Sequence, residues 1–285
     1  MAILIDNLDR AWVKDADVLQ LSPFLLGLFG AASQLVNDFS RQDSRRKRVN
    51  CTAAIFLRSD IFNRVYEIAR EPDKLAVTRL SWNDTEMLSH VLERRFLNAH
   101  PAASSGAELW TRYFCTSARN KTPRDYILSR ILPRPRDIVY FVKTAISVAV
   151  NRGHARIEED DILKAEYEYS KYALDSIMVE NSITIPELTN VLYEFTGSPV
   201  IVGENEVRAG LGKAGIPAEK YGAVRDHLIF LNFIGIEIEP DRFVYVDDPR
   251  EVKKFTVLAN KISEQRGLAR YQVHPAFRAY LEMNE

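Results

Sequence analysis

Three short segments of the sequence place charged side chains where a phosphate and its metal ion could be bound. The first is the apolar run at residues 3–5, which ends in Asp6 and has Asn7 and Asp9 directly behind it. A carboxylate held rigidly at the carboxyl end of a sheet strand can order Mg²⁺ and its water molecules, as a nucleotide hydrolase requires. The alternative is structural, because many buried strands end in an aspartate.

The other two segments each supply an arginine. Arg58 follows the apolar run at 52–57, and its guanidinium could contact a terminal phosphate. Arg136 lies in the segment Leu-Pro-Arg-Pro-Arg-Asp at 132–137, at the predicted start of a helix, and could reach the same phosphates. Each segment alone is weak evidence for a phosphate-binding site. The prediction depends on the order of the three segments along the chain.

The apolar pattern indicates the elements that must position these side chains. Continuous apolar runs at 2–5, 52–57 and 75–80 predict three buried strands. Helical spacing at 15–39 and 61–70 predicts the helices that connect them. Strand, helix, strand, helix, strand is the order of a parallel α/β sheet.

The rest of the chain is predicted to be mostly helical. Helical patterns follow at about 83–96, 106–118, 123–132, 135–152 and 158–181. Three short helices at 185–196, 204–214 and 218–231 then precede a hairpin formed by 233–239 and 243–246, and terminal helices follow at about 249–265 and 274–283. Three helices followed by a hairpin is the order of a winged helix. The predicted fold class is therefore α/β and then mostly α.

In this order and spacing, the three segments resemble a bacterial AAA+-like P-loop ATPase of the STAND/KAP division, from its Walker B strand onward. Ile3 to Arg10 is similar to the Walker B strand, Phe56 to Asp60 to the sensor-1 strand end, and Pro135-Arg136 to the sensor-2 start of the lid. The resemblance implies four parts: a partial P-loop NTPase core at 1–82, a helical lid at 83–182, a winged helix at 183–248 and C-terminal helices at 249–285. Several such ATPases are associated with phage defence.

The resemblance also implies a role for each charged residue. Asp6 would order the Mg²⁺ and Asp9 would orient the attacking water. Arg58 would contact the γ-phosphate, and Arg136 would couple the lid to the state of the nucleotide. Asn7 follows the first Walker B acid and would adjoin the nucleotide. Many of these hydrolases have a catalytic Glu or Asp at this position. Because an amide positions water but cannot take its proton, turnover would be slow or would depend on Asp9.

The sequence contains no Gly-x-x-x-x-Gly-Lys-Ser/Thr motif, so the Walker A cradle for phosphates is missing. Neither 27–30 nor 210–213, both rich in glycine, has the required spacing. We therefore expect a fragment, an alternative-start product or half of a split gene that is inactive as an ATPase alone. ATP and Mg²⁺ would bind only if the missing half were supplied. The strand at 3–5 would present an apolar edge suited to a protein partner or a second copy.

Composition and charge limit the alternatives. The 285 residues carry a net charge of −1 and two cysteines, without a signal peptide or an apolar run long enough to span a membrane, which predicts a cytoplasmic protein. A winged helix suggests a non-enzymatic DNA-binding regulator, and the basic run at 45–48 could assist it. However, residues 183–248 hold 5 basic and 11 acidic side chains, a net of −6, which disfavours nucleic acid. A structural adaptor with an incidental Asp6 is a third possibility.

Overall fold

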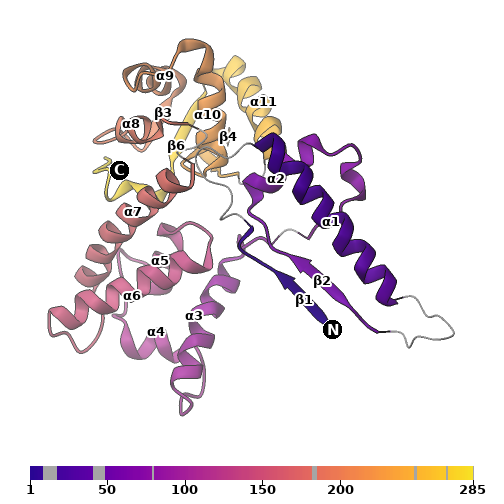
Figure 1. Cartoon of the computed structure of the whole chain (residues 1–285). Helices are drawn as coiled ribbons and strands as arrows, with labels where there is room; N and C mark the ends of the chain where they lie inside the picture. Colours follow the sequence, from indigo (N-terminus) through magenta and orange to yellow (C-terminus); the bar gives the residue numbers. More distant parts are fainter. Residues whose placement is uncertain are drawn as a thin grey trace. The chain divides into compact units, whose positions relative to one another are not determined.

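A computed structural model describes residues 1–8, 18–40, 49–78, 80–181, 185–246, 249–267 and 269–284. The chain divides into two compact units, Met1–Arg79 and Leu80–Glu285. Each unit is described by itself (Figure 1).

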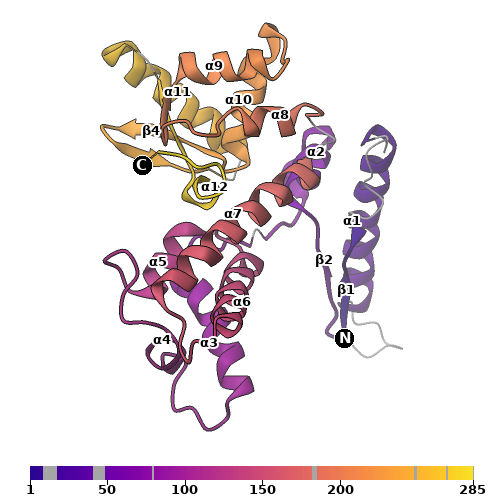
Figure 2. The same cartoon turned by 90° about the vertical axis from the view of Figure 1, so that its left-hand side faces the viewer.

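The first unit is built on two parallel strands. β1 (Ala2–Ile5) pairs with β2 (Thr52–Ile55) so that Ile5 lies opposite Ile55. A parallel pair requires a long connection, and the helix α1 (Val18–Ser40) lies within it. α1 contacts β2 and α2 (Ser59–Ile68), as Figures 1 and 2 show. Side chains of Leu25, Ile61 and Val65 form the small buried core.

The expected third strand at 75–80 is wrong for the residues that the structure describes there. A short 3₁₀ turn (Pro72–Lys74) is followed by extended chain that pairs with neither β1 nor β2. Val77 is 52% exposed, so the apolar run has no surface against which to be buried. Among the described residues the parallel sheet therefore has two strands.

The second unit begins with five helices, which confirm the helical pattern predicted for this region. Local signals set their starts: Asp84 accepts a hydrogen bond from the amide of Glu86, Thr122 accepts one from that of Asp125, and prolines open the third and fourth helices. The long pair α6 and α7 lie against each other (Figure 2). The helices are α3 (Thr85–Ala99), α4 (Glu108–Tyr113), α5 (Pro123–Arg130), α6 (Pro135–Asn151) and α7 (Glu159–Asn181).

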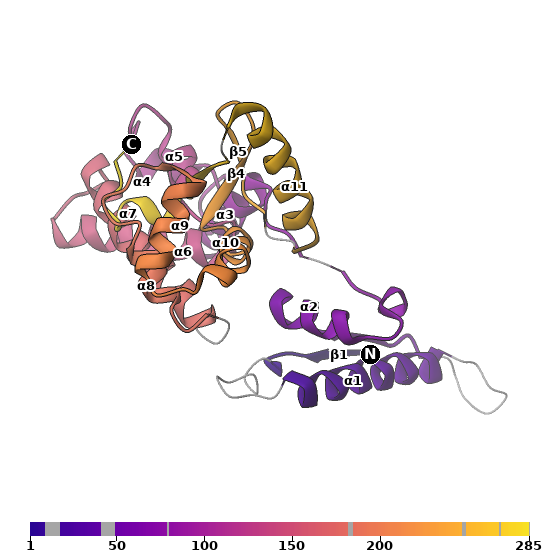
Figure 3. The ribbon, with the colours of Figure 1, turned by 90° about the horizontal axis from the view of Figure 1, so that it is seen from above.

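The remaining part of this unit combines short helices with a four-stranded antiparallel sheet. The elements in chain order are α8 (Leu188–Tyr193), β3 (Ile201–Gly203), α9 (Glu204–Lys213), a 3₁₀ turn (Ala218–Lys220), α10 (Tyr221–Phe230), β4 (Ile234–Glu239), β5 (Arg242–Val244), α11 (Pro249–Arg266), β6 (Arg270–Val273) and α12 (Pro275–Arg278). The predicted hairpin is present as β4 and β5. Figure 3 shows α10 and α11 beside β4, which they contact.

Two strands of this sheet were not predicted. The strand order is β3-β6-β4-β5, so β6, from the end of the chain, lies between β3 and β4. Its Tyr271 and Val273 are buried while Arg270 and Gln272 are half-exposed, which is the alternation of a strand. The predicted helix at 274–283 is correspondingly shorter, because α12 spans only four residues.

A single hydrophobic core runs through the second unit from Leu88 to Met283. It includes buried side chains of the five helices and of the mixed part that follows. The contact of α12 with α7 joins these two parts, and the amide of Tyr280 donates to the hydroxyl of Ser170 on α7 at 3.0 Å. The whole segment 80–285 is thus held together by shared burial.

Candidate functional site

Asp6 and Arg58 follow neighbouring strands at the same end of the parallel sheet. Ile5 lies opposite Ile55, and the amide of Phe56 donates to the carbonyl of Ile5 at 2.8 Å, which extends the pairing by one residue. Asp6 comes directly after β1 and Arg58 comes three residues after β2. The carboxyl ends of parallel strands are where α/β sheets bind their ligands.

The chain turns sharply after Asp6. Its Oδ1 atom accepts a hydrogen bond from the amide of Asn7 at 2.7 Å, and Asn7 has a φ of 62°. Asparagine tolerates this left-handed conformation better than most residues, so it suits the turn. The Asp6 side chain is exposed at the turn. Asn7 therefore has a structural reason to be at this position, whatever ligand Asp6 meets.

Arg58 also has a structural role. It precedes α2 with an extended backbone, and its carbonyl accepts a hydrogen bond from the amide of Phe62 at 2.9 Å. This arrangement fixes the backbone of Arg58 between the sheet and the helix. Asp9 and the basic run at 45–48 lie outside the described residues.

The side chains at this sheet edge supply only some of the ligands that a nucleotide–Mg²⁺ site requires. Mg²⁺ is held in such sites by one or two carboxylates together with phosphate oxygens, and Asp6 offers one carboxylate. Over the described ranges, no group of three His, Cys, Asp or Glu residues could hold a metal ion. The sequence also contains no Gly-x-x-x-x-Gly-Lys-Ser/Thr motif to bind the phosphates. The residues present therefore do not form a complete ATP–Mg²⁺ site.

Arg136 belongs to the second unit, at the second position of α6. Two other residues of this helix start are more firmly held. Asp137 is fully buried and accepts a hydrogen bond from the Tyr169 hydroxyl at 2.8 Å, and the same hydroxyl accepts one from the amide of Leu132 at 2.9 Å. Arg134 Nη2 donates to Asp137 Oδ1 at 3.1 Å.

Asp137 thus contacts both arginines, but unequally. Arg134 Nε lies 2.8 Å from Asp137 Oδ2, an ion pair whose angle does not make a hydrogen bond, whereas Arg136 Nε is 3.6 Å away. Burial raises the pKa of Asp137, and the two arginines and Tyr169 oppose this rise. Nothing local in the sequence indicates that Asp137, at an ordinary helix start, is buried.

The structure therefore brings together two of the four predicted catalytic residues. Asp6 and Arg58 share one sheet edge in the first unit. Arg136 is in the second unit. Its place at a helix start is confirmed, and its approach to the other two residues stays a prediction.

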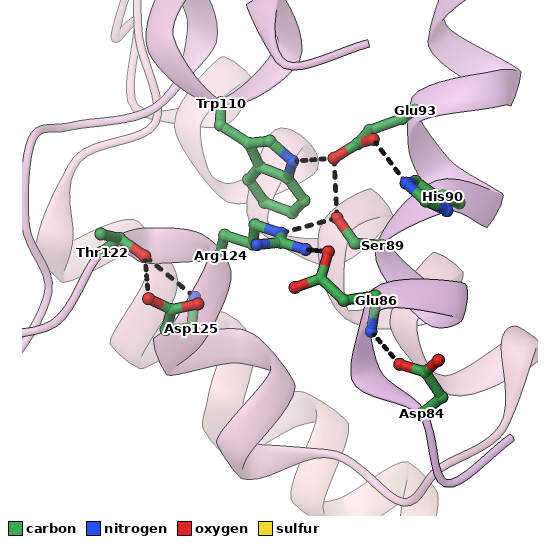
Figure 4. Close-up of polar contacts among 9 residues, drawn as sticks. All are labelled: Asp84, Glu86, Ser89, His90, Glu93, Trp110, Thr122, Arg124 and Asp125. Atoms are coloured by element: carbon green, nitrogen blue, oxygen red, sulfur yellow. Dashed lines mark hydrogen bonds and ion pairs between the residues drawn. The ribbon is translucent and has the colours of Figure 1, made fainter.

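A polar network on α3, α4 and α5 forms a second cluster of ionisable groups (Figure 4). The Ser89 hydroxyl donates to Glu93 at 2.8 Å and accepts from Arg124 Nε at 2.8 Å. The Trp110 indole also donates to Glu93, at 3.1 Å, and Arg124 pairs with Glu86. Because Ser89 is fully buried and its hydroxyl is held by Glu93 and Arg124, we interpret this cluster as a structural contact among three helices.

The helix expected to enter DNA in a winged helix is α10. Its Arg225 has a side chain only 14% exposed, 3.3 Å from Glu204 and 2.9 Å from Asp226. The Tyr271 hydroxyl also donates to Glu204 at 2.6 Å. Burial would raise the pKa of Glu204, but the hydrogen bond from Tyr271 and the neighbouring arginines outweigh it and lower the pKa. Arg225 therefore stabilises the fold instead of offering its charge to a phosphate backbone.

None of the described helices is long and apolar enough to cross a membrane.

Comparisons with known proteins give two kinds of match. Residues 86–178 match the family described as the FunZ-associated C-terminal helical domain. Two solved structures of RuvB from Thermotoga maritima are similar, one a lysine-to-arginine mutant and the other an arginine-to-alanine variant. The identities are 15% and 16%, the TM-scores are 0.33 and 0.35, and 78% and 89% of this chain are covered. This chain spans 65% and 70% of the RuvB chains. Comparison with curated protein sequences finds no match.

Proposed function

We propose that this chain is the Walker B-onward portion of an AAA+-related P-loop ATPase of the STAND/KAP type, which acts in nucleotide-gated regulation or assembly. The observation that carries the proposal is the in-register parallel pairing of β1 and β2, which puts Asp6 and Arg58 at one sheet edge. ATP and Mg²⁺ bind only when a Walker A-bearing half completes the site. A role in bacterial defence, suggested by the resemblance, is part of the proposal.

The second unit supplies the remaining parts. The helices α3 to α7 make the lid, over 83–182, and the match of 86–178 to a helical domain supports treating them as one module. The elements from α8 to β5 make the winged helix, over 183–248, and α11 and α12 lie in the C-terminal segment 249–285. The likeness to RuvB is compatible with an AAA+ relation, but at these TM-scores the proposal does not rest on it.

Each charged residue has one task in the proposed site. Asp6 would hold the Mg²⁺ and its water through the carboxylate, and Arg58 would contact the terminal phosphate. Arg136 binds the phosphates from the lid side. Asn7 could hold a water molecule through its amide but could not accept a proton, so turnover would be slow or would depend on Asp9, which would help to orient the attacking water. The chemistry that Mg²⁺ supplies when bound is neutralisation of phosphate charge.

The partner class follows from the incomplete sheet. Over the described part of the chain β1 pairs only with β2, and Leu4 is 68% exposed. Parallel sheets are normally covered on both faces, and this supports a second polypeptide as the partner of the sheet. We expect a protein partner or a second copy, in the cytoplasm.

Nucleotide binding tests the proposal. Titration with a fluorescent ATP analogue and Mg²⁺ is compared for this chain and for the chain extended by the residues encoded upstream of the Met1 codon. We expect binding by the extended chain alone, and loss of that binding in Asp6→Ala. Asp38→Ala, which removes an exposed carboxylate on α1, is the matched control. An extended chain that does not bind ATP would refute the proposal.

The alternative function is a DNA-binding regulator, which the order α9, α10, β4, β5 favours. Titration of duplex DNA at about 50 mM and about 200 mM salt distinguishes the two functions. We expect weak binding, because Arg225 is held by Glu204 and Asp226. Tight binding that falls steeply with salt would favour the regulator instead.

A further inference from the structure

The last described residues of the chain, 275–284, contact both parts of the second unit. We call the helices of 80–181 the helical part and the elements of 185–273 the sheet part. Residues 275–284 follow β6, which lies between β3 and β4 in the sheet. They are therefore attached covalently to the sheet part, and any contact that they make with the helical part joins the two.

On the helical side, these residues contact α7 and α5. α12 lies next to α7 (Figure 2) and contacts both helices. The amide of Tyr280 donates to the hydroxyl of the fully buried Ser170 at 3.0 Å. The centroid of the Tyr280 ring lies 5.5 Å from that of Tyr167 and 6.0 Å from Nζ of Lys171. Tyr280 is thus fixed on α7 through both its backbone and its ring.

On the sheet side, the same residues are bonded to α8 and to the chain that follows it. The amide of Gly197 donates to the carbonyl of Leu281 at 2.9 Å, and Nδ2 of Asn284 donates to the carbonyl of Gly197 at 3.0 Å. A hydrogen bond with Tyr280 raises the pKa of Tyr193, on α8. Tyr280 therefore contacts α7 with its backbone and ring, and α8 with its hydroxyl.

The apolar side chains of this segment belong to the core of the unit. Ala276, Phe277 and Leu281 are fully buried, and the Phe277 ring centroid lies 5.1 Å from that of Phe233, directly before β4. The match to the helical family ends at residue 178. The helical part of this chain is therefore held by a segment that lies outside the matched residues.

A second attachment limits how the two parts can move. Parts of a chain that are joined by one connection rotate about it by default, unless a large apolar interface holds them. The first connection here leads from the end of α7 to α8, and residues 275–284 return to α7 after the whole sheet part. Attachments at both ends of the sheet part oppose bending as well as rotation at the end of α7.

We propose that residues 275–284 form a strap that locks the sheet part onto the helical part, with Tyr280 as its main contact, so that the two parts move as one body. In the proposed ATPase, the winged helix would then follow each movement of the lid, a consequence that rests on the proposed function. The locking itself rests only on the contacts of residues 275–284. The two statements can therefore be tested separately.

Cutting the first connection tests the strap. A protease site replaces residues 182–184 in the full chain, the folded protein is cut to completion, and the N-terminal fragment is held on a resin by an affinity tag. We expect the fragment 185–285 to stay bound, because the strap still reaches α7. Immediate release of this fragment on cutting would overturn the proposal.

Variants of the strap show whether it is what holds the fragment. Tyr280→Ala removes a ring and a hydroxyl from the contact and should raise the release rate about tenfold, as for a tyrosine that anchors an interface. Tyr193→Phe removes only the hydroxyl that bonds Tyr280, so its effect should be smaller. An unchanged rate in Tyr280→Ala, or in Tyr193→Phe where Tyr280→Ala does not fold, would overturn the proposal.

Tyr113→Ala is the matched control for the release experiment. Tyr113 is also half-buried, and its ring lies near Phe96 and His100 within the helical part. The variant loses a similar side chain without touching the strap, so it should release the fragment at the wild-type rate. Faster release in Tyr113→Ala, equal to that in Tyr280→Ala, would show that general destabilisation and not the strap sets the rate.

Spin-label distances test the movement as one body in the upstream-extended chain with ATP. Ser147→Cys on α6 and Ala209→Cys on α9 carry the labels at exposed positions, after Cys51 and Cys115 are changed to alanine. We expect one narrow distance distribution that ATP does not move and that Tyr280→Ala broadens. A distribution that moves when ATP binds would overturn the movement as one body. Absence of ATP binding is the failure of the proposed function, which the release rates do not share.

Discussion

At the scale of single residues, buried carboxylates hold several turns of the second unit in place. Asp161, at the start of α7, is fully buried. It accepts hydrogen bonds from Arg152 at 3.0 Å and from the amide of Glu158 at 3.0 Å, and it lies 2.7 Å from His154 Nδ1. Burial would raise the pKa of Asp161, but these contacts outweigh it and lower the pKa. The α6–α7 turn therefore depends on an ionised carboxylate.

Asp161→Asn should lower the free energy of unfolding at neutral pH by about 1–3 kcal/mol, because charge-assisted hydrogen bonds are lost. A carboxylate whose folded pKa lies below its unfolded value stabilises the protein above the unfolded pKa, near 4, and loses that effect as the pH falls through the folded pKa. The difference between variant and wild type should therefore shrink on acidification below about pH 4. Urea unfolding at several pH values measures it.

Asp160→Asn is the control for this prediction. Asp160 is adjacent, its side chain is 77% exposed, and its nearest approach to Arg152 is 4.0 Å. Exposed pairs of this kind contribute little, so the variant should match the wild type at every pH. Equal destabilisation by the two variants would show that burial of Asp161 is not what matters.

At the scale of elements, the contact between α3 and the start of α4 depends on a glycine. A Cβ atom added at Gly106 would lie 2.5 Å from the Cβ of Glu93, on α3. Glu93 in turn accepts the hydrogen bonds from Trp110 and Ser89 (Figure 4). Glycine is therefore required at 106 because the backbone there lies close to Glu93, and not because of an unusual backbone angle.

Gly106→Ala should lower the free energy of unfolding by about 1–3 kcal/mol, the usual cost of overpacking. Glu93 accepts a hydrogen bond from the Trp110 indole, so displacement of Glu93 should also change the fluorescence of Trp110. Gly222→Ala is the control, because Gly222 lies in α10 with no atom within 4 Å of an added Cβ. That change should be neutral or stabilising by up to about 1 kcal/mol. A Gly106→Ala variant as stable as the wild type would show that the close approach to Glu93 does not require glycine.

At the scale of the whole molecule, the two units differ in the size of their hydrophobic cores. The continuous core lies entirely between Leu88 and Met283, whereas the described core of the first unit consists of Leu25, Ile61 and Val65. Stability should therefore reside in the second unit. The first unit should gain stability from whatever covers its parallel sheet.

A shortened chain comprising residues 80–285 should fold by itself. We expect one cooperative transition, with a midpoint within a few degrees of the main transition of the full chain, because its core is intact. Differential scanning calorimetry, with Trp110 fluorescence as a second probe, measures both transitions. A shortened chain without a cooperative transition would show that Met1–Arg79 contributes to the stability of the second unit.

The sequence by itself determined the features that depend on neighbouring residues. Caps and prolines located the helices of 83–181, and apolar alternation with a turn located the β4–β5 hairpin. The ends of two apolar runs placed Asp6 and Arg58 after strands, and the parallel pairing then brought them to one edge.

Only the tertiary structure decided the features that depend on distant segments. The run at 75–78 forms no strand because it pairs with none of the described strands, while β6 becomes a strand because β3 and β4 flank it. Asp137 and Tyr169, 32 residues apart, meet only through the packing of α6 on α7. Burial and long-range pairing are properties of what surrounds a residue. Neither the absence of a strand at 75–78 nor the burial of Asp137 could therefore be predicted from local sequence.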